Sequence, residues 1–157
     1  MAPAQASLLA KLDTQERVRD FLTNAVASGR ASHAYLFLGA PGAGKLDAAW
    51  ALAQAFLCEQ DGCGACDSCV RVARHTHPDV HYYTPESATG YLIAQTRELL
   101  DDVPLAPIRA KAKVYIIDRA EQLRANTANA LLKTLEEPPE GVMFILLGTS
   151  ADVMLPT

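Results

Sequence analysis

The chain has 157 residues, half of them apolar, which is enough for one domain with a substantial core. Its 18 acidic residues outnumber its 14 lysines and arginines, which argues against a protein that coats nucleic acid by charge alone. No segment approaches the roughly 20 apolar residues that cross a bilayer, and the N-terminus lacks a signal-peptide pattern. We therefore expect a cytoplasmic protein without membrane contact.

The apolar pattern predicts helices that alternate with strands along the chain. In chain order we expect a helix at 14–28, a strand at 35–38, a helix at 47–57, a strand at 80–83, a helix at 93–100, a strand at 114–117, a helix at 127–137 and a strand at 144–147. Pro138 and Pro139 must end the last helix. Because the strands are apolar without polar alternation, the pattern predicts an α/β fold with a parallel sheet covered on both faces.

A glycine-rich loop after the first expected strand matches a phosphate-binding motif. The segment 39–45 has the pattern G-x4-G-K, in which backbone N–H groups and a lysine converge on phosphate oxygens. A tight glycine turn without a ligand is the alternative. Leu46 stands where such loops carry the hydroxyl that binds Mg²⁺, and Asp47 lies about 100° further around the helix. The expected nucleotide contacts here are Gly39, Pro41, Gly42, Gly44, Lys45 and Leu46.

A carboxylate at a strand end supplies the second half of this site. Asp118 follows four apolar residues, which bring it to the edge of the sheet where ligands bind in α/β folds. Hydrolytic sites of this kind usually place a glutamate next, whereas Arg119 is a permanent cation and cannot act as a base. A carboxylate that only caps a turn is the alternative for Asp118. The two altered positions predict a degenerate ATP site that does not hydrolyse efficiently, with nucleotide binding itself in doubt.

Four cysteines at short, regular spacings predict a metal site. Cys58, Cys63, Cys66 and Cys69 can wrap one tetrahedral ion, and a closed set of four soft ligands favours a structural Zn²⁺. His75 and His77 are interpreted as turn residues, because four thiolates complete the shell. An iron–sulfur cluster and unmetallated cysteines are the alternatives.

These motifs together resemble the clamp-loader subunits of bacterial DNA polymerase III, which belong to the AAA+ class. The resemblance rests on four stretches: 32–37, the cysteine module, 113–118 and 129–139. It implies a three-layer α/β/α P-loop domain over residues 1–157 with a zinc-binding insertion at about 58–69. It also implies that Thr149, just past the last strand, occupies the position that senses a γ-phosphate; a turn residue is the alternative.

Two subunit types share these motifs, the ATP-hydrolysing gamma/tau motor and the delta-prime stator. His77 to Val80, the Pro85-Glu86 pair and the changes at Leu46 and Arg119 resemble delta-prime. That resemblance implies a non-catalytic subunit in a hetero-pentamer with gamma/tau and delta, which loads the sliding clamp onto primer-template DNA. The gamma/tau motor is the alternative.

The resemblance also implies which parts of the family's machinery this chain holds. Residues 154–157 match the lead-in to the family's arginine finger, so we expect the finger, the lid and the collar beyond residue 157. Asn129 and Lys133 lie off the apolar stripe of their helix and are expected to be solvated, or to face a neighbouring subunit or DNA. Arg109, Lys111 and Lys113 are expected to flank an edge of the sheet.

Two functions from other classes fit the sequence less well than a clamp-loader subunit does. A self-contained nucleotide kinase would need an acceptor site and a cluster of catalytic arginines, and the sequence offers neither. A zinc-bearing DNA-binding module is disfavoured by the acidic charge balance and by the lack of a basic and aromatic surface pattern.

Overall fold

Over residues 7–13 and 15–149, which the computed structural model describes, four parallel strands form one sheet. The order across the sheet is β1-β4-β3-β2. The strands are β1 (Ala34–Leu38), β2 (Val80–Tyr83), β3 (Lys113–Ile117) and β4 (Val142–Gly148). Each contains the apolar run from which it was expected, and the parallel pairing confirms the inference from unbroken apolar strands.

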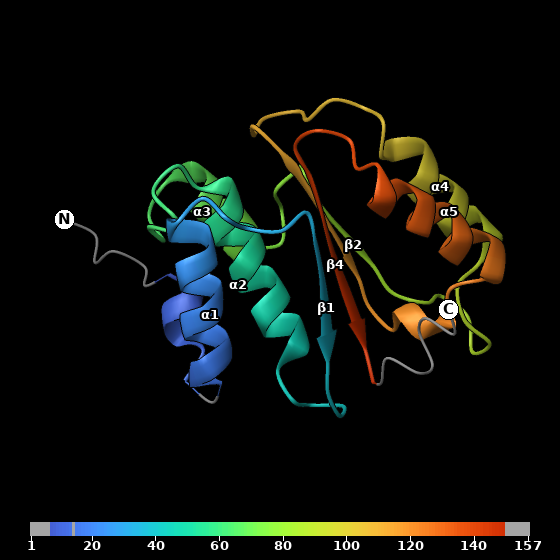
Figure 1. Ribbon diagram of the computed structural model, residues 1–157, viewed down its shortest axis with the longest axis horizontal. Coiled ribbons are helices and arrows are strands. Elements are labelled where there is room, and N and C mark those ends of the chain that lie inside the picture. The colour runs from blue at the N-terminus through green and yellow to red at the C-terminus, as the bar shows by residue number, and fades with distance from the viewer. Residues whose placement is uncertain (1–6, 14, 150–157) are drawn as a thin grey trace.

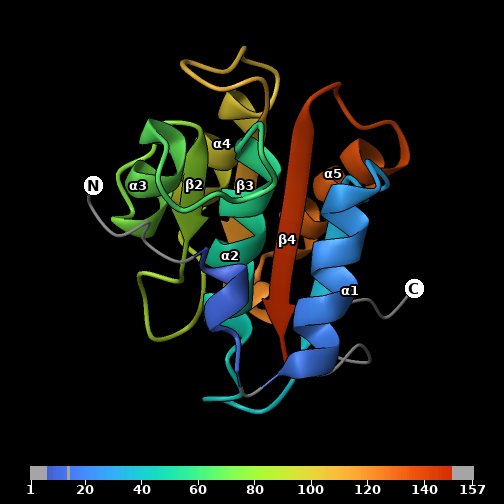
Figure 2. The same cartoon turned by 90° about the vertical axis from the view of Figure 1, so that its left-hand side faces the viewer.

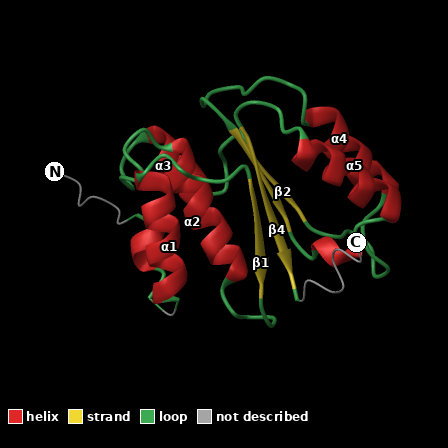
Figure 3. Ribbon diagram, in the orientation of Figure 1, coloured by secondary structure: helices red, strands yellow, loops and turns green. Residues whose placement is uncertain are grey.

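Helices cover both faces of this sheet and complete a three-layer α/β/α arrangement (Figures 1 and 3). Figure 2 shows the first layer in front of the sheet. The first layer holds α1 (Glu16–Ala27), α2 (Lys45–Leu57) and α3 (Asp67–Ala73), and the second holds α4 (Ile93–Asp102) and α5 (Ala125–Glu136). Two short 3-10 helices are η1 (Leu9–Lys11) and η2 (Ala120–Gln122). The expected fold class is confirmed; α3, inside the cysteine module, was not predicted.

The two inner strands, β3 and β4, contribute side chains to two separate hydrophobic cores, one on each face of the sheet. Val114 and Ile116 of β3 pack in the core that includes α1 and α2, while Tyr115 and Ile117 pack in the core that includes α4 and α5. This follows from the strand period of two, which turns successive side chains to opposite faces. All four side chains are fully buried, so β3 is held rigidly and fixes the position of the residue that follows it.

Helix α5 ends where the sequence requires. It stops at Glu136, because Pro138 and Pro139 cannot continue the hydrogen-bond ladder. Leu131 is buried against the sheet, whereas Asn129 and Lys133 are exposed, as expected from the apolar stripe.

The expectation that Lys113 flanks a sheet edge is wrong. Lys113 begins β3, an inner strand, and only 2% of the residue is exposed. Its Nζ donates hydrogen bonds to the carbonyl oxygens of Asp102 (2.5 Å) and Val103 (3.2 Å) at the end of α4, and lies 3.5 Å from the Asp102 carboxylate. These partners offset the cost of burying the charge. Arg109 and Lys111, which precede the same inner strand, are exposed.

Candidate nucleotide site and metal centre

The glycine-rich loop connects β1 to α2 at the carboxyl ends of the strands. Gly42 (φ 81°) and Gly44 (φ 94°) adopt the left-handed conformation that a side chain would strain, and Gly44 caps the start of α2. The loop is also tight at Gly39, where an added Cβ would lie 3.3 Å from the Cβ of Ala43. The glycines are therefore needed for the shape of the loop, whichever ligand it holds.

Lys45, the first residue of α2, is held by backbone carbonyl groups. Its Nζ donates to the carbonyl oxygen of Gly39 at 2.6 Å and to that of Gly148 at 3.1 Å. The lysine thus ties the start of the loop to the end of β4. A phosphate group would have to compete with these two acceptors for the ammonium protons.

A cavity of about 410 Å³ opens beside this loop and gathers most of the expected site. Its lining includes the expected residues Pro41, Gly42, Gly44, Lys45, Leu46, Asp118 and Thr149. Of the expected residues only Gly39 does not line it, and Gly39 contributes its carbonyl to Lys45 instead. Residues from β3, β4 and the loop thus meet at one edge of the sheet, as the sequence predicted.

Two features of the cavity bear on metal binding. Leu46 lines it where a hydroxyl would be required, and its side chain also packs against the core of the first helix layer. Asp118 has both carboxylate oxygens occupied: Oδ1 accepts from the backbone N–H of Arg119 at 2.9 Å, and Oδ2 accepts from the hydroxyl of Tyr82 at 3.0 Å. The Tyr82 contact could not be predicted, because it joins residues 36 apart in sequence.

Arg119 stands in the cavity wall in a strained backbone conformation. Its φ of 45° lies in the left-handed region, which is uncommon for a residue with a side chain. The guanidinium donates to the hydroxyl of Thr84 at 3.2 Å. Arg119 thus places a cation directly after β3, at the position where hydrolytic sites usually carry a glutamate that orients water.

Glu121, on η2, is a cavity residue that the sequence analysis missed. It lines the same cavity, and among the described residues its Oε2 is the one buried side-chain oxygen or nitrogen without a hydrogen-bond partner. Its position three residues after Asp118 was the available signal. It adds a third acidic side chain to Asp118 and Asp47 around the cavity.

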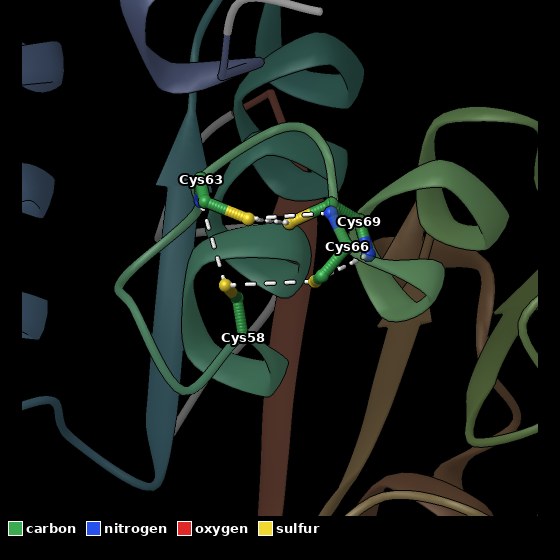
Figure 4. A group of neighbouring side chains, drawn as sticks. All are labelled: Cys58, Cys63, Cys66 and Cys69. Atoms are coloured by element: carbon green, nitrogen blue, oxygen red, sulfur yellow. Dashed lines mark hydrogen bonds between the residues drawn. The ribbon is translucent and has the colours of Figure 1, made fainter. Parts of the chain in front are cut away.

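The phosphate loop precedes α2 and the cysteine module follows it, so the two lie at opposite ends of this helix (Figure 1). The four cysteine side chains converge on one point (Figure 4). All four Sγ atoms lie within 4.8 Å of one another. The Cys58–Cys66 and Cys63–Cys69 sulfur distances are 3.8 and 3.9 Å. A tetrahedron with Zn–S bonds of about 2.3 Å has edges of about 3.8 Å, so the spacing fits one Zn²⁺.

The protonation chemistry of these thiols also fits a cation. Backbone N–H groups of Ala65 and Cys66 lower the pKa of Cys63 to about 6. Burial raises the pKa of Cys58, but the backbone N–H groups of Gln60, Gly62 and Cys63 outweigh this effect and leave that pKa below its ordinary value. Burial raises the pKa of Cys66 and of Cys69. Four thiolates could share this space only with a cation between them, and a dication would supply that charge.

The two histidines are placed outside the cysteine cluster. His77 is buried; its Nδ1 accepts from the backbone N–H of Asp79 at 3.0 Å, and its Nε2 lies 3.1 Å from the hydroxyl of Ser68. The ring of His75 stacks on Trp50 with centroids 3.8 Å apart. Neither belongs to the metal-ligating set, which supports their interpretation as turn residues.

Asp79 anchors the segment that leads into β3, a role that the sequence analysis missed. It is fully buried, and its carboxylate accepts from the backbone N–H groups of Ile108 (2.6 Å), Arg109 (2.7 Å) and Ala110 (2.7 Å). Burial raises the pKa of Asp79, but the three N–H groups outweigh it and hold that pKa below its ordinary value. No local pattern marks this contact, because it spans about 30 residues.

The parallel sheet, the loop ending at Lys45 and the strand-end Asp118 define the three-layer P-loop class of domains, to which AAA+ domains belong. The family model described as "DNA polymerase III, delta subunit" matches residues 14–157. The chain therefore belongs to the family of DNA polymerase III clamp-loader subunits.

Relatives from both subunit types are similar to this chain. It is 39% identical over 148 residues to DNA polymerase III subunit delta' of Bacillus subtilis, covering 92% of this chain and 45% of the relative. It is 43% identical over 139 residues to DNA polymerase III subunit tau of Escherichia coli, covering 86% of this chain and 21% of the relative. These similarities do not separate the two types.

A solved structure supports the fold. A DNA polymerase III gamma subunit-related protein from Thermotoga maritima matches with a TM-score of 0.60 at 20% identity, over 87% of this chain and 41% of that one. The chain thus spans less than half the length of these relatives. Among the described residues, no helix is both long enough and apolar enough to cross a membrane.

Proposed function

We propose that the chain is the P-loop domain of a delta-prime-type subunit, a stator that helps load the sliding clamp onto primer-template DNA without hydrolysing ATP. In this proposal it works in the bacterial cytoplasm, in a hetero-pentamer with gamma/tau and delta subunits. It reaches the clamp and the DNA through that complex. The similarity to the delta' subunit of Bacillus subtilis supports the assignment.

The observation that carries the proposal is the chemistry of the cavity. Leu46 offers no oxygen to Mg²⁺, and Arg119 offers no base. Asp118, at the end of β3, already accepts hydrogen bonds on both oxygens. An ATPase needs a metal ligand and a group that orients water, and the positions that normally supply them are changed here. In this proposal the cavity keeps the shape of a nucleotide site but lacks the groups that ATP hydrolysis requires.

The four cysteines belong to the proposal as a structural Zn²⁺ site. Their residue type and spacing leave no open coordination position, so the metal would have no catalytic role. The 154–157 stretch that resembles the lead-in to an arginine finger lies outside the described residues.

Titration with a fluorescent ATP analogue tests the degenerate site. In the wild-type chain we expect binding that Mg²⁺ does not strengthen, because Leu46 stands where the loop normally supplies the hydroxyl that binds the metal. The double variant Leu46→Thr, Arg119→Glu is expected to bind at least about tenfold more tightly with Mg²⁺ than without it, a difference of about 1.4 kcal/mol. Arg97→Glu, an exposed change of the same charge on α4, is the control. Tight, Mg²⁺-dependent binding by the wild type would refute the proposal and favour the motor.

A second experiment uses the assembled clamp loader with full-length subunits. Lys45→Met removes the ammonium that any P-loop motor requires and keeps the aliphatic stem. For a stator we expect ATP hydrolysis by the complex to change by less than about twofold, whereas loss of a motor's phosphate-binding lysine costs well over tenfold. Gel filtration must show that the variant still assembles with its partners.

The gamma/tau-type motor remains the second candidate. The 43% identity to the tau subunit of Escherichia coli favours it, and Glu121 adds a carboxylate to the cavity. Steady hydrolysis in the complex that disappears in the Lys45→Met variant would select this alternative.

A further inference from the structure

Gln54 joins the cysteine module to the N-terminal segment. Gln54 belongs to α2, and the residue is only 2% exposed. Its Nε2 donates to the carbonyl oxygen of Cys69 at 3.1 Å, and its Oε1 accepts from the backbone N–H of Leu8 at 2.8 Å. One buried amide thus uses both ends to connect a metal-ligating residue with a segment 61 positions earlier in the chain.

A second contact joins the same two parts of the molecule. Gly62, between Cys58 and Cys63, has φ of 95°, and an added Cβ would lie 3.2 Å from the Cα of Ala55 and 3.5 Å from the hydroxyl oxygen of Ser7. The knuckle, formed by residues 58–69, therefore packs directly on α2 and on the N-terminal segment, residues 7–12. Residues 7–12 are held on one side by the metal knuckle and on the other by α2, where Leu9 is buried.

The segment held in this way forms the wall of a groove beside the phosphate loop. The groove has a volume of about 280 Å³; Leu8 and Leu12 line one side, and Gly44 and Asp47 line the other. Trp50 also lines it, stacked on His75, which follows the end of the knuckle helix α3. The wall formed by Leu8 and Leu12 therefore depends on contacts with the cysteine module.

We propose that a metal bound at the four cysteines anchors residues 7–12 against α2, with Gln54 as the positioning residue that transmits this anchorage. The metal fixes Cys69, Cys69 presents its carbonyl to Gln54, and Gln54 orients its oxygen toward the N–H of Leu8. Without the metal, the thiol contacts of 3.8 to 3.9 Å are too weak to fix the knuckle. The cysteine module thereby shapes the groove next to the phosphate loop from the opposite end of α2.

Hydrogen exchange in the chain loaded with Zn²⁺ tests this proposal. Removal of the metal with a thiol-reactive mercurial and a chelator is expected to speed amide exchange at Leu8 to Leu12 by about tenfold or more, the change that follows loss of a buried hydrogen bond. The amide of Ile116 in β3 serves as the internal control. The single tryptophan, Trp50, is expected to change its emission in the same experiment.

The variant Gln54→Met tests whether the Gln54 amide transmits the effect of the metal. Methionine has a similar volume but lacks the hydrogen-bond donor and the strong acceptor of the amide. It is expected to retain one Zn²⁺ per chain by elemental analysis while Leu8 to Leu12 exchange as fast as in the metal-free wild type. Gln60→Met, an exposed change of the same kind within the knuckle, is expected to keep the slow exchange.

Three outcomes would overturn the proposal: no metal bound, unchanged exchange at Leu8 to Leu12 after metal removal, or wild-type protection in a folded Gln54→Met variant. If that variant does not fold, the metal-removal experiment on the wild type decides alone. None of these measurements involves nucleotide or partner subunits, so the stator proposal stands or falls separately.

Discussion

Cys66→Ser is expected to lower the melting temperature of the zinc-loaded chain by about 10 °C. A ligand present at 1,000 times its dissociation constant stabilises the folded state by about 4 kcal/mol. For a domain of this size each kcal/mol corresponds to about 2 to 4 °C. Cys66 is chosen because it is one of the four clustered cysteines proposed to bind the metal, and its sulfur also accepts the N–H of Cys69 at the start of α3.

Calorimetry with and without added Zn²⁺ measures this effect. Ala65→Ser is the matched control, because it places the same serine side chain on the exposed neighbouring residue without removing a ligand. The wild type and the control are expected to gain stability with Zn²⁺, and Cys66→Ser to gain little. A Cys66→Ser chain that melts with the wild type while both contain one metal ion would show that the cluster is not the metal site.

Local patterns were sufficient to predict the parallel strands and to show which residues would lie together at the two candidate sites. β3 was predicted from an unbroken apolar run, and the structure buries it on both faces for the reason that makes such runs diagnostic. The cavity was predicted from Lys45 and Asp118, since the carboxyl ends of parallel strands meet at one edge. The cysteine cluster was predicted from spacing, because short loops between ligands leave few ways to place four thiols.

Contacts between distant residues were not predictable. The sequence around Lys113 resembles an exposed basic edge. Its burial depends on the end of α4, where two backbone carbonyl oxygens accept hydrogen bonds from its Nζ. Likewise Asp118 meets Tyr82 only because β2 and β3 are neighbours, which no local pattern specifies. The hydrophobic period and the spacing of residues predict the local structure of one segment, whereas these contacts depend on how separate segments pack.

Asp79→Asn is expected to destabilise the folded chain by about 3 kcal/mol at neutral pH. The carboxylate accepts three backbone N–H groups inside the protein, and a hydrogen bond to a charged group contributes about 1.5 to 3 kcal/mol. Asparagine keeps the shape but loses the charge and one acceptor. Chemical denaturation measures the loss, with Asp101→Asn, an exposed change of the same kind on α4, expected to stay within about 0.5 kcal/mol of wild type.

The pH dependence of this difference separates a charge effect from a packing effect. Because the pKa of Asp79 is lower in the folded chain than in the unfolded chain, its contribution is fully present above the unfolded value of about 3.9 and is lost as the pH falls through the folded value. The stability difference between wild type and Asp79→Asn is therefore expected to be constant from about pH 5 to 7 and to shrink below about pH 4. A difference that persists unchanged at pH 3 would mean that the asparagine disturbs packing, and that the charge on Asp79 does not hold the segment before β3.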